Sequence, residues 1–583
     1  MHIFGHPLSV NAPRPGPILD RWAHTQLSPF TQGISTVSLR MAFDDWASHL
    51  AMNPDEQLKL LQLGVLSAQE WAHYAAQAHD QHCKPCIEPM VHDTRFSHPG
   101  WQAWPFNAIS QAFLLTQQWW QEATTGVRGV SPHHESVVNF AARQCLDMVS
   151  PANFVLTNPE VWQRTQETMG ANLRQGFQNW LEEAQRWQRG QPPAGTEAYQ
   201  VGQQVAITPG QVIYRNHLIE LIQYAPSTDQ VRPEPVLIVP SWIMKYYILD
   251  LSPHNSLIRF LVDQGHTVFA MSWVNPDSDD RDLDMDDYLR MGVVDALEVV
   301  CAVVPRQKVH ALGYCLGGTL LAIAAAAMAR DADDRLASLT LLAAQTDFTE
   351  PGELELFIDD SQVAHLEDIM WDRGYLDSSQ MASAFQWMNS NDLIWSRLLK
   401  HYLLGERAPM SDLMAWNADG TRLPYRMHAE YLRRMFLNND LASGRYPVHG
   451  KPVALTAIQC PIYALGTVHD HVAPWRSVHK LHLLTNVDTT FVLTSGGHNV
   501  GIVNPPGVPG RSFQALTRRH DGAYLDPDAW LRAASRHEGS WWTHWLSWLQ
   551  DHSGEPGPLP NMGAPDMGLS PLADAPGHYV LKK

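Results

Sequence analysis

A cysteine stands in a glycine-rich turn between a strand pattern and a helix pattern in the middle of the chain. The apolar residues 309–312 lead into Gly313-Tyr314-Cys315-Leu316-Gly317-Gly318, and an alanine-rich apolar stretch follows. A strand, a sharp turn and a helix in this order form a nucleophile elbow, here with cysteine where serine is usual. The glycines leave room for the turn, and a helix amino terminus stabilises a thiolate. The alternative, a buried structural cysteine, is disfavoured by the flanking strand and helix.

Short apolar strand patterns alternate with helical patterns after about residue 199, which is typical of a parallel sheet covered by helices. The interval 347–452 between the fourth and fifth strands is too long for an ordinary connection, so we expect an inserted cap or lid over the carboxyl edge of the sheet. The sequence therefore predicts an α/β chain with the α/β-hydrolase fold. The predicted strands are residues 236–239, 266–273, 309–312, 339–343, 462–465 and 490–493.

The first third of the chain has helical patterns instead. Asn158 is a plausible cap, with Pro159 as the first residue of a helix that continues to Gln188, and a Gly-Gln-Pro-Pro run at 190–193 ends it. We therefore predict a mainly helical amino-terminal domain at residues 1–197 and a catalytic domain at residues 198–583 that contains the lid.

Two later loops supply the remaining members of a catalytic triad. In this fold the acid and then the histidine follow the nucleophile along the chain, each after a later strand. Asp470 follows the strand at 462–465, and His498 follows the strand at 490–493. His469 and His471 compete with His498, but both precede the last strand, so we expect them to shape the pocket. The alternative role for Asp470 is an Asx turn or helix cap ahead of Pro474.

An oxyanion hole needs two backbone N–H donors. The first is Leu316, directly after the nucleophile, and the second comes from the loop at 240–246 after the first parallel strand. We favour Ile243, with Trp242 nearly equal, because sequence does not fix the direction of an N–H group.

Composition excludes several classes of protein. The 60 acidic and 41 basic residues among 583 give a formal charge of −19, which would repel nucleic acid. The longest apolar run, residues 320–329, is about half a membrane span. The amino terminus lacks the pattern of a signal peptide, so we expect the protein in the cytoplasm. Cys83 and Cys86 form a C-x-x-C without the second pair of a zinc site, so we expect no metal.

Several further motifs occur in a fixed order along nearly the whole chain. Together with the elbow they resemble the polyhydroxyalkanoate synthase, or poly(3-hydroxyalkanoate) polymerase, family. The motifs are Ser150-Pro151-x-Asn153-Phe154, Thr157-Asn158-Pro159-Glu160, Lys245-Tyr246-Tyr247-Ile248-Leu249-Asp250-Leu251, Trp416-Asn417-x-Asp419-x-Thr421-x-Leu423-Pro424, Asp470-His471-x-x-Pro474-Trp475, Gly497-His498, Asn504-Pro505-Pro506 and Gly539-Ser540-Trp541-Trp542.

This resemblance implies an acyltransferase that polymerises (R)-3-hydroxyacyl-CoA, for example to poly(3-hydroxybutyrate), and releases CoA. It also implies a cytoplasmic homodimer at the surface of the polyester granule, with no cofactor beyond the thioester substrate. Cys315 matches the family's nucleophile, Asp470 its acid and His498 its general base. The chain departs from the pattern at Ser241, where many members have proline, and at Met244, where many have asparagine. The first seventy residues look like a segment found in only some members.

The chemistry of these residues leaves one rival reaction. A thiolate that attacks a thioester keeps the acyl group activated for a second attack by a 3-hydroxyl. With water as the acceptor the same triad gives hydrolysis, so the alternative is a cytoplasmic polyester depolymerase or an acyl-CoA thioesterase. A non-catalytic granule-coating protein is disfavoured by the intact triad.

Overall fold

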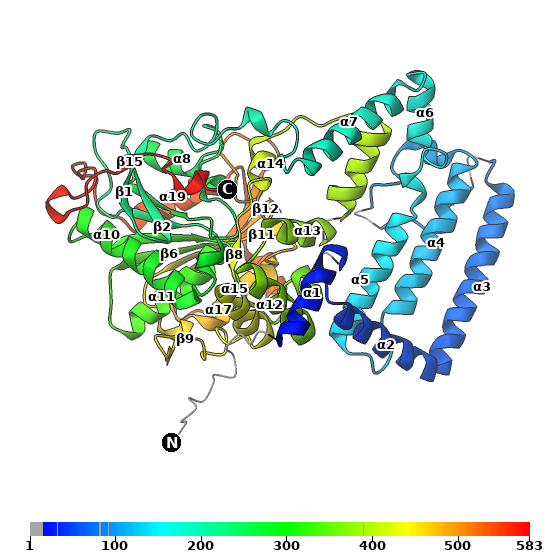
Figure 1. Ribbon diagram of the computed structural model, residues 1–583, viewed down its shortest axis with the longest axis horizontal. Helices are drawn as coiled ribbons and strands as arrows, with labels where there is room; N and C mark the ends of the chain where they lie inside the picture. Colours follow the sequence, from blue (N-terminus) through cyan, green and yellow to red (C-terminus); the bar gives the residue numbers. More distant parts are fainter. Residues whose placement is uncertain (1–15, 32, 81–82, 91–92, 389) are drawn as a thin grey trace. The chain divides into compact units, whose positions relative to one another are not determined.

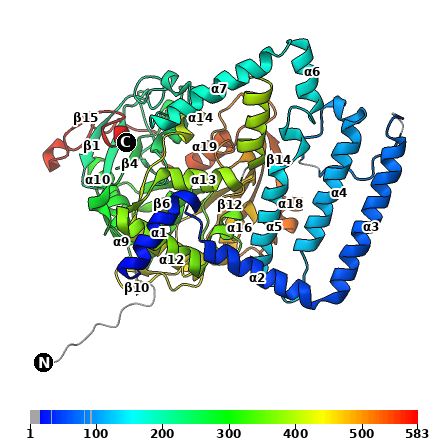
Figure 2. The ribbon, with the colours of Figure 1, turned by 45° about the vertical axis from the view of Figure 1, so that its right-hand side comes forward.

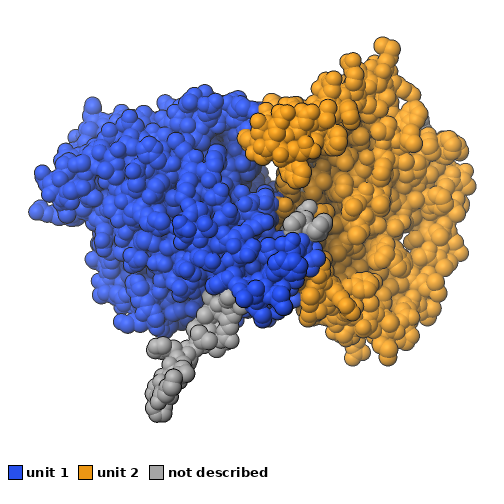
Figure 3. Space-filling model, in the orientation of Figure 1, with its two compact units in different colours: residues 1–33, 195–382, 410–583 blue, residues 34–194, 383–409 orange. Residues whose placement is uncertain are grey.

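A computed structural model of the chain describes residues 16–583 except 32, 81–82, 91–92 and 389, so the features predicted for residues 1–7 lie outside it. The chain forms two compact units (Figure 3): unit 1 contains residues 1–33, 195–382 and 410–583, and unit 2 contains residues 34–194 and 383–409. The predicted boundary near residue 197 stays a prediction. The units differ from it in two segments: residues before 34 group with unit 1, and part of the predicted lid groups with unit 2.

An eleven-stranded sheet forms the centre of unit 1, in the order β14-β13-β12-β11-β6-β5-β3-β4-β2-β1-β15. The six strands from β12 to β4 are parallel, and the strands outside them pair antiparallel. The strands are β1 (Gly210–Arg215), β2 (Ile219–Tyr224), β3 (Val236–Val239), β4 (Val268–Trp273), β5 (Val309–Tyr314), β6 (Leu336–Leu342), β11 (Ile462–His469), β12 (Thr489–Gly497), β13 (Ser512–Arg518), β14 (Ser535–Glu538) and β15 (Ala573–Asp574).

The parallel strands are buried on both faces, which explains their continuous apolar runs. In β3, Val236 and Ile238 pack into one hydrophobic cluster, and Leu237 and Val239 pack into another on the opposite face. All six predicted strands are present with small changes at their ends, so the structure confirms the α/β-hydrolase architecture.

Helices cover both faces of this sheet. Helices α10 and α11 pack on one face, while α8 and α19 contribute to the cluster on the other (Figure 1). The helices assigned wholly to unit 1 are α1 (Ile18–Thr31), α8 (Leu257–Asp263), α9 (Met285–Asp287), α10 (Asp295–Val303), α11 (Leu316–Arg330), α12 (Asp360–Arg373), α14 (Asp412–Asn417), α15 (Tyr425–Tyr431), α16 (Trp475–His479), α17 (Leu481–Leu484), α18 (Pro527–Ala533) and α19 (Trp541–Asp551), together with the π-helical segments η6 (Tyr288–Val294) and η10 (Leu432–Leu437).

The insertion after β6 is largely helical, as predicted. It also contains the short strand pair β7 (Tyr375–Leu376) and β8 (Leu423–Pro424), helix α13 (Ser378–Met388), the π-helical segments η8 (Asn391–Trp395) and η9 (Leu398–Leu403), and the strand pair β9 (Pro447–Val448) and β10 (Lys451–Pro452).

The amino-terminal helix α1 packs against α12 of this insertion. Asp368 of α12, which is 5% exposed, accepts hydrogen bonds from the Gly16 backbone N–H and from His24 Nδ1, both at 2.7 Å. The segment that contains Gly16 and α1 therefore packs against the insertion and is hydrogen-bonded to it.

Unit 2 is a group of helices in which α3, α4 and α5 lie side by side (Figures 1 and 2). Its helices are α2 (Thr36–Met52), α3 (Pro54–Gln77), α4 (Phe106–Thr124), α5 (Pro132–Met148), α6 (Pro159–Glu167) and α7 (Ala171–Gln188). No described helix of either unit combines the length and the apolar character that a membrane span requires.

The helix predicted to run from Pro159 to Gln188 is two helices, so this prediction was wrong in one respect. The Asn158 side chain does cap α6, since it accepts from the N–H groups of Glu160 and Val161 at 2.9 and 3.3 Å. The break follows because Gly170 has a φ of 82°, which glycine adopts without a steric penalty but an α-helix does not use.

The last residues complete the edge of the sheet. Strand β15 pairs with β1, and the buried carboxylate of Glu220 in β2 accepts the backbone N–H groups of His578 and Tyr579, both at 2.8 Å. The Pro- and Gly-rich stretch at 554–577 is thus ordered against strands that lie far away in the sequence.

Two buried histidines belong to the short helices α16 and α17 and pack against β12. The rings of His479 and His482 are 4.7 Å apart and pack on Phe491, and no described residue forms a hydrogen bond with any of their four nitrogens. Burial lowers the pKa of His479 to about 4 and that of His482 to about 3. Both rings are therefore neutral in the folded protein at neutral pH.

Acid should destabilise the fold through these rings. The unfolded chain binds protons below its histidine pKa of about 6.5, whereas folded His482 does not, so stability is full above that pH and falls as the pH drops toward 3. From pH 7 to pH 5, His482 should remove about 2 kcal/mol. We expect the His482→Phe variant to lose less thermal stability than the parent between pH 7 and pH 5. The exposed control His578→Phe should lose as much thermal stability as the parent. Equal losses in both variants would contradict the assignment.

Candidate active site

Cys315 lies directly after β5, in a turn that few residues other than glycine adopt. Its φ is 52°, and its backbone N–H donates to the carbonyl of Leu342 in β6 at 2.9 Å. A Cβ atom on Gly317 would lie 2.3 Å from the Val239 carbonyl oxygen, and one on Gly313 would lie 2.4 Å from the Gly318 Cα. The glycines are therefore required by close backbone contacts, and the predicted elbow has the strained geometry of a nucleophile turn.

Asp470 and His498 lie directly after β11 and β12 and are joined by a hydrogen bond. His498 Nδ1 lies 2.8 Å from Asp470 Oδ2, which also accepts from the Thr467 hydroxyl at 3.0 Å. The other carboxylate oxygen accepts the N–H groups of Val472 and Ala473 at 2.9 and 2.7 Å. The carboxylate is fully buried and is held in one orientation by four donors.

Charge couples this pair to the cysteine. Burial lowers the pKa of His498, but the Asp470 carboxylate and the Cys315 thiolate outweigh burial and hold that pKa well above its usual range. Burial raises the pKa of Asp470, but the charge and hydrogen bond of His498 and two backbone N–H groups outweigh it, so the pKa stays below its usual range. The arrangement favours a protonated imidazole beside the Asp470 carboxylate.

The competing histidines lie elsewhere. His469 and His471 are exposed, and in the described structure neither ring bonds to Asp470. The structure thus brings His498, and neither of these two, to the carboxylate.

The candidate oxyanion donors occupy the elbow and the loop after β3. Leu316 is the first residue of α11, and among the described residues nothing accepts its backbone N–H. The Ile243 N–H is engaged, since it donates to the Ser241 hydroxyl at 3.4 Å, the outer limit of a hydrogen bond. Ser241 is one of the two positions at which the chain departs from the family pattern named above. Its hydroxyl accepts the same N–H group that is the proposed oxyanion donor.

The insertion supports this loop. The Thr421 hydroxyl donates to the Trp242 carbonyl at 2.6 Å, and Trp416 Nε1 donates to the Lys245 carbonyl at 2.7 Å. The tryptophan and threonine motif that carries part of the resemblance therefore fixes the backbone beside the elbow.

Three further residues, Tyr314, Asn499 and Asn417, form hydrogen bonds next to the proposed triad and had no predicted role. The Tyr314 hydroxyl donates to Asn499 Oδ1 at 2.6 Å, and the Asn499 amide donates to Asn417 at 3.3 Å. The ring of Tyr314 also packs on His498, with ring centroids 5.6 Å apart. Their adjacency to Cys315 and His498 in the sequence was the available signal for Tyr314 and Asn499.

The described residues contain no group of three or more His, Cys, Asp and Glu side chains able to hold a metal ion. Cys83 and Cys86 are free thiols.

Family models match most of the chain. Residues 92–261 match the poly-beta-hydroxybutyrate polymerase (PhaC) N-terminus, residues 14–55 match the poly-beta-hydroxybutyrate polymerase N terminal model, and residues 234–505 match the alpha/beta hydrolase fold.

Curated relatives align with this chain over most of its length. The chain is 40% identical over 537 residues to the poly(3-hydroxyalkanoate) polymerase of Methylorubrum extorquens. This alignment covers 91% of this chain and 88% of the relative. It is 36% identical over 501 residues to the poly(3-hydroxyalkanoate) polymerase subunit PhaC of Cupriavidus necator. This alignment covers 85% of this chain and 84% of the relative. With a cysteine elbow, a buried Asp-His pair at neighbouring strand ends and this extent of similarity, the chain belongs to the poly(3-hydroxyalkanoate) polymerase family.

Proposed function

We propose that this protein is an acyltransferase that polymerises (R)-3-hydroxyacyl-CoA into polyester and releases CoA. The observation that carries the proposal is the 2.8 Å hydrogen bond between His498 and Asp470 beside a cysteine elbow, in a member of the polymerase family. Cys315 is the proposed nucleophile, His498 the general base and Asp470 the residue that orients and charges the imidazole.

The first half-reaction transfers the acyl group to the enzyme. The Cys315 proton passes to His498, and the sulfur attacks the thioester carbonyl. The N–H groups of Leu316 and Ile243 are the proposed donors to the resulting oxyanion. The bond from the acyl carbon to the CoA sulfur then breaks, and CoA leaves with the proton from His498.

The second half-reaction forms the ester. His498 takes the proton of a 3-hydroxyl, and the hydroxyl oxygen attacks the acyl-Cys315 thioester. The bond from carbon to sulfur breaks and an ester remains, and His498 returns its proton to the sulfur, which restores the cysteine. A hydroxyl must outcompete water for this step, so the insertion after β6 is the proposed cover.

We further place the protein in the cytoplasm at the surface of polyester granules. Support comes from unit 2, which exposes large apolar side chains around α6 and α7 of the kind that bind apolar surfaces. They are Leu156, Trp162, Met169, Phe177, Trp180 and Trp187. The homodimer that the resemblance implies stays a prediction.

Replacement of the nucleophile should abolish the reaction. Cys315→Ala cannot form the acyl-enzyme, and Cys315→Ser should retain little activity because a hydroxyl is a much weaker acid than a thiol. The measurement is free thiol released from 3-hydroxyacyl-CoA. Activity of Cys315→Ala within about tenfold of the parent would refute the assignment.

Replacement of His498 and replacement of His471 should have different effects on turnover. His498→Ala should lower turnover by about 10²- to 10⁴-fold, because it removes the proposed base, whereas His471→Ala should lose much less. His471 is the matched control, since it is next to Asp470 in the chain but its ring does not bond to it. The reverse ranking in steady-state assays would reassign the base.

An acyl-CoA without the 3-hydroxyl should distinguish synthesis from hydrolysis. It should acylate Cys315 and stall, because the acyl group brings no nucleophile for the second step. The mass of the intact protein should rise by one acyl group, and this increase should be absent in Cys315→Ala. About one equivalent of CoA should be released per site. Sustained release with free acid accumulating would show instead that the enzyme is a thioesterase.

A further inference from the structure

Three aromatic side chains pack together between the loop after β3, the segment η6 and helix α15. The ring of Trp242 lies 5.5 Å from Tyr288 and 6.5 Å from Tyr431, centroid to centroid. Their exposed fractions are 2%, 1% and 7%. We call these three residues the aromatic triad.

The polar atoms of the aromatic triad have no protein partner. Trp242 Nε1 is buried, and no described residue accepts its hydrogen; nor does any described residue form a hydrogen bond with the hydroxyls of Tyr288 and Tyr431. Buried polar groups in proteins are nearly always hydrogen-bonded, so the unpaired Trp242 Nε1, packed against two tyrosines whose hydroxyls also lack a described hydrogen-bond partner, calls for an explanation. A ligand that carries oxygen atoms would supply their partners.

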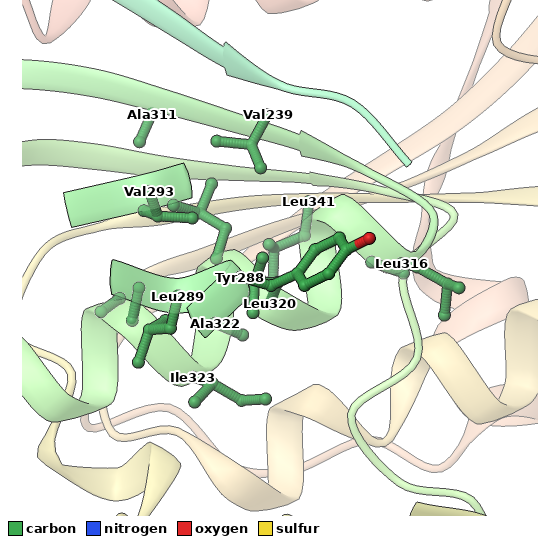
Figure 4. Close-up of a cluster of buried hydrophobic side chains, with 14 of the residues drawn as sticks. Val239, Tyr288, Leu289, Val293, Ala311, Leu316, Leu320, Ala322, Ile323 and Leu341 are labelled. Atoms are coloured by element: carbon green, nitrogen blue, oxygen red, sulfur yellow. The ribbon is translucent and has the colours of Figure 1, made fainter. Parts of the chain in front are cut away.

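The aromatic triad lies beside the nucleophile. Trp242 directly precedes the proposed oxyanion donor Ile243, and Figure 4 shows the Tyr288 ring pointing toward Leu316, the residue after Cys315. Tyr431 belongs to the same hydrophobic cluster as Trp242, Tyr288 and Leu316, and Cys315 packs against this cluster.

The other ring neighbours of Tyr431 are aromatic, and one of them is the buried imidazole of His428 at 6.1 Å. Phe436 and Phe348 lie 5.4 and 6.2 Å from its ring, and Trp242 closes a third side. An acyl chain on Cys315 would thus meet apolar walls and a few isolated polar atoms. A site built to bond a hydroxyl rejects the analogue that lacks it, because the polar groups of the site are then left unpaired.

We propose that the Tyr431 hydroxyl hydrogen-bonds the oxygen on carbon 3 of the acyl group attached to, or arriving at, Cys315. Trp242 Nε1 and the Tyr288 hydroxyl line the same acyl site, so the aromatic triad selects 3-hydroxyacyl over plain acyl thioesters. This inference rests on the proposed function and adds to it the residue that recognises the hydroxyl.

The test is single-turnover acylation of the full-length protein by 3-hydroxybutyryl-CoA and by butyryl-CoA, followed by intact mass and CoA release. Tyr431→Phe should acylate about tenfold more slowly with the hydroxyacyl substrate and at an unchanged rate with butyryl-CoA. Tyr288→Phe should shift the same ratio in the same direction, which provides a second variant.

Tyr425→Phe is the matched control. Tyr425 lies in the same helix α15, and its hydroxyl is also buried without a described partner, but its ring packs on Trp371 at 5.2 Å, away from the aromatic triad. Its ratio of the two acylation rates should equal that of the parent.

Each outcome has a separate meaning. Equal slowing of Tyr431→Phe with both substrates, or no change with either, overturns the hydroxyl contact and leaves the proposed function standing. Failure of the parent to acylate Cys315 with either substrate overturns both. Normal acylation by butyryl-CoA shows at the same time that the variant is folded.

Discussion

The active site depends on how closely the elbow packs against the end of β3. Gly317 has no Cβ, and a Cβ there would lie 2.3 and 2.5 Å from the carbonyl oxygens of Val239 and Pro240. This approach sets the amino terminus of α11, with Leu316, beside the loop that carries Ile243 and Trp242, the two candidates for the second oxyanion donor. A side chain at this position would push helix and strand apart, and would separate Cys315 from the loop that carries the proposed oxyanion donor.

Much of the fold was predictable because the parallel strands are buried on both faces and read as unbroken apolar runs. The antiparallel strands were not: β2, with the sequence Ile219-Glu220-Leu221-Ile222-Gln223-Tyr224, carries a buried carboxylate that pairs with Arg215 and also accepts the backbone N–H groups of the distant residues His578 and Tyr579. The break before α7 also escaped prediction, since helical periodicity continues on both sides of Gly170.

The order of nucleophile, acid and histidine could be predicted, because parallel strands place their carboxyl ends on one edge. The link from Asn499 to Asn417, the bond from Ile243 to Ser241 and the unpaired Tyr431 hydroxyl could not. They depend on side-chain directions across a long insertion, which neither spacing nor periodicity encodes. Sequence thus predicted the candidate catalytic residues, and the structure added which residues surround them.

The pairing of the last residues with β1 and β2 bears on how the chain is made. The Glu220 carboxylate pairs with Arg215 nearby, but it also accepts the N–H group of His578, 358 residues further along, so the edge of the sheet cannot be completed until that segment has left the ribosome. The helices between residues 34 and 194 emerge earlier and contact mostly one another. We therefore expect helical folding during synthesis and a late closure of the sheet, an interval in which its unpaired strands need protection from aggregation.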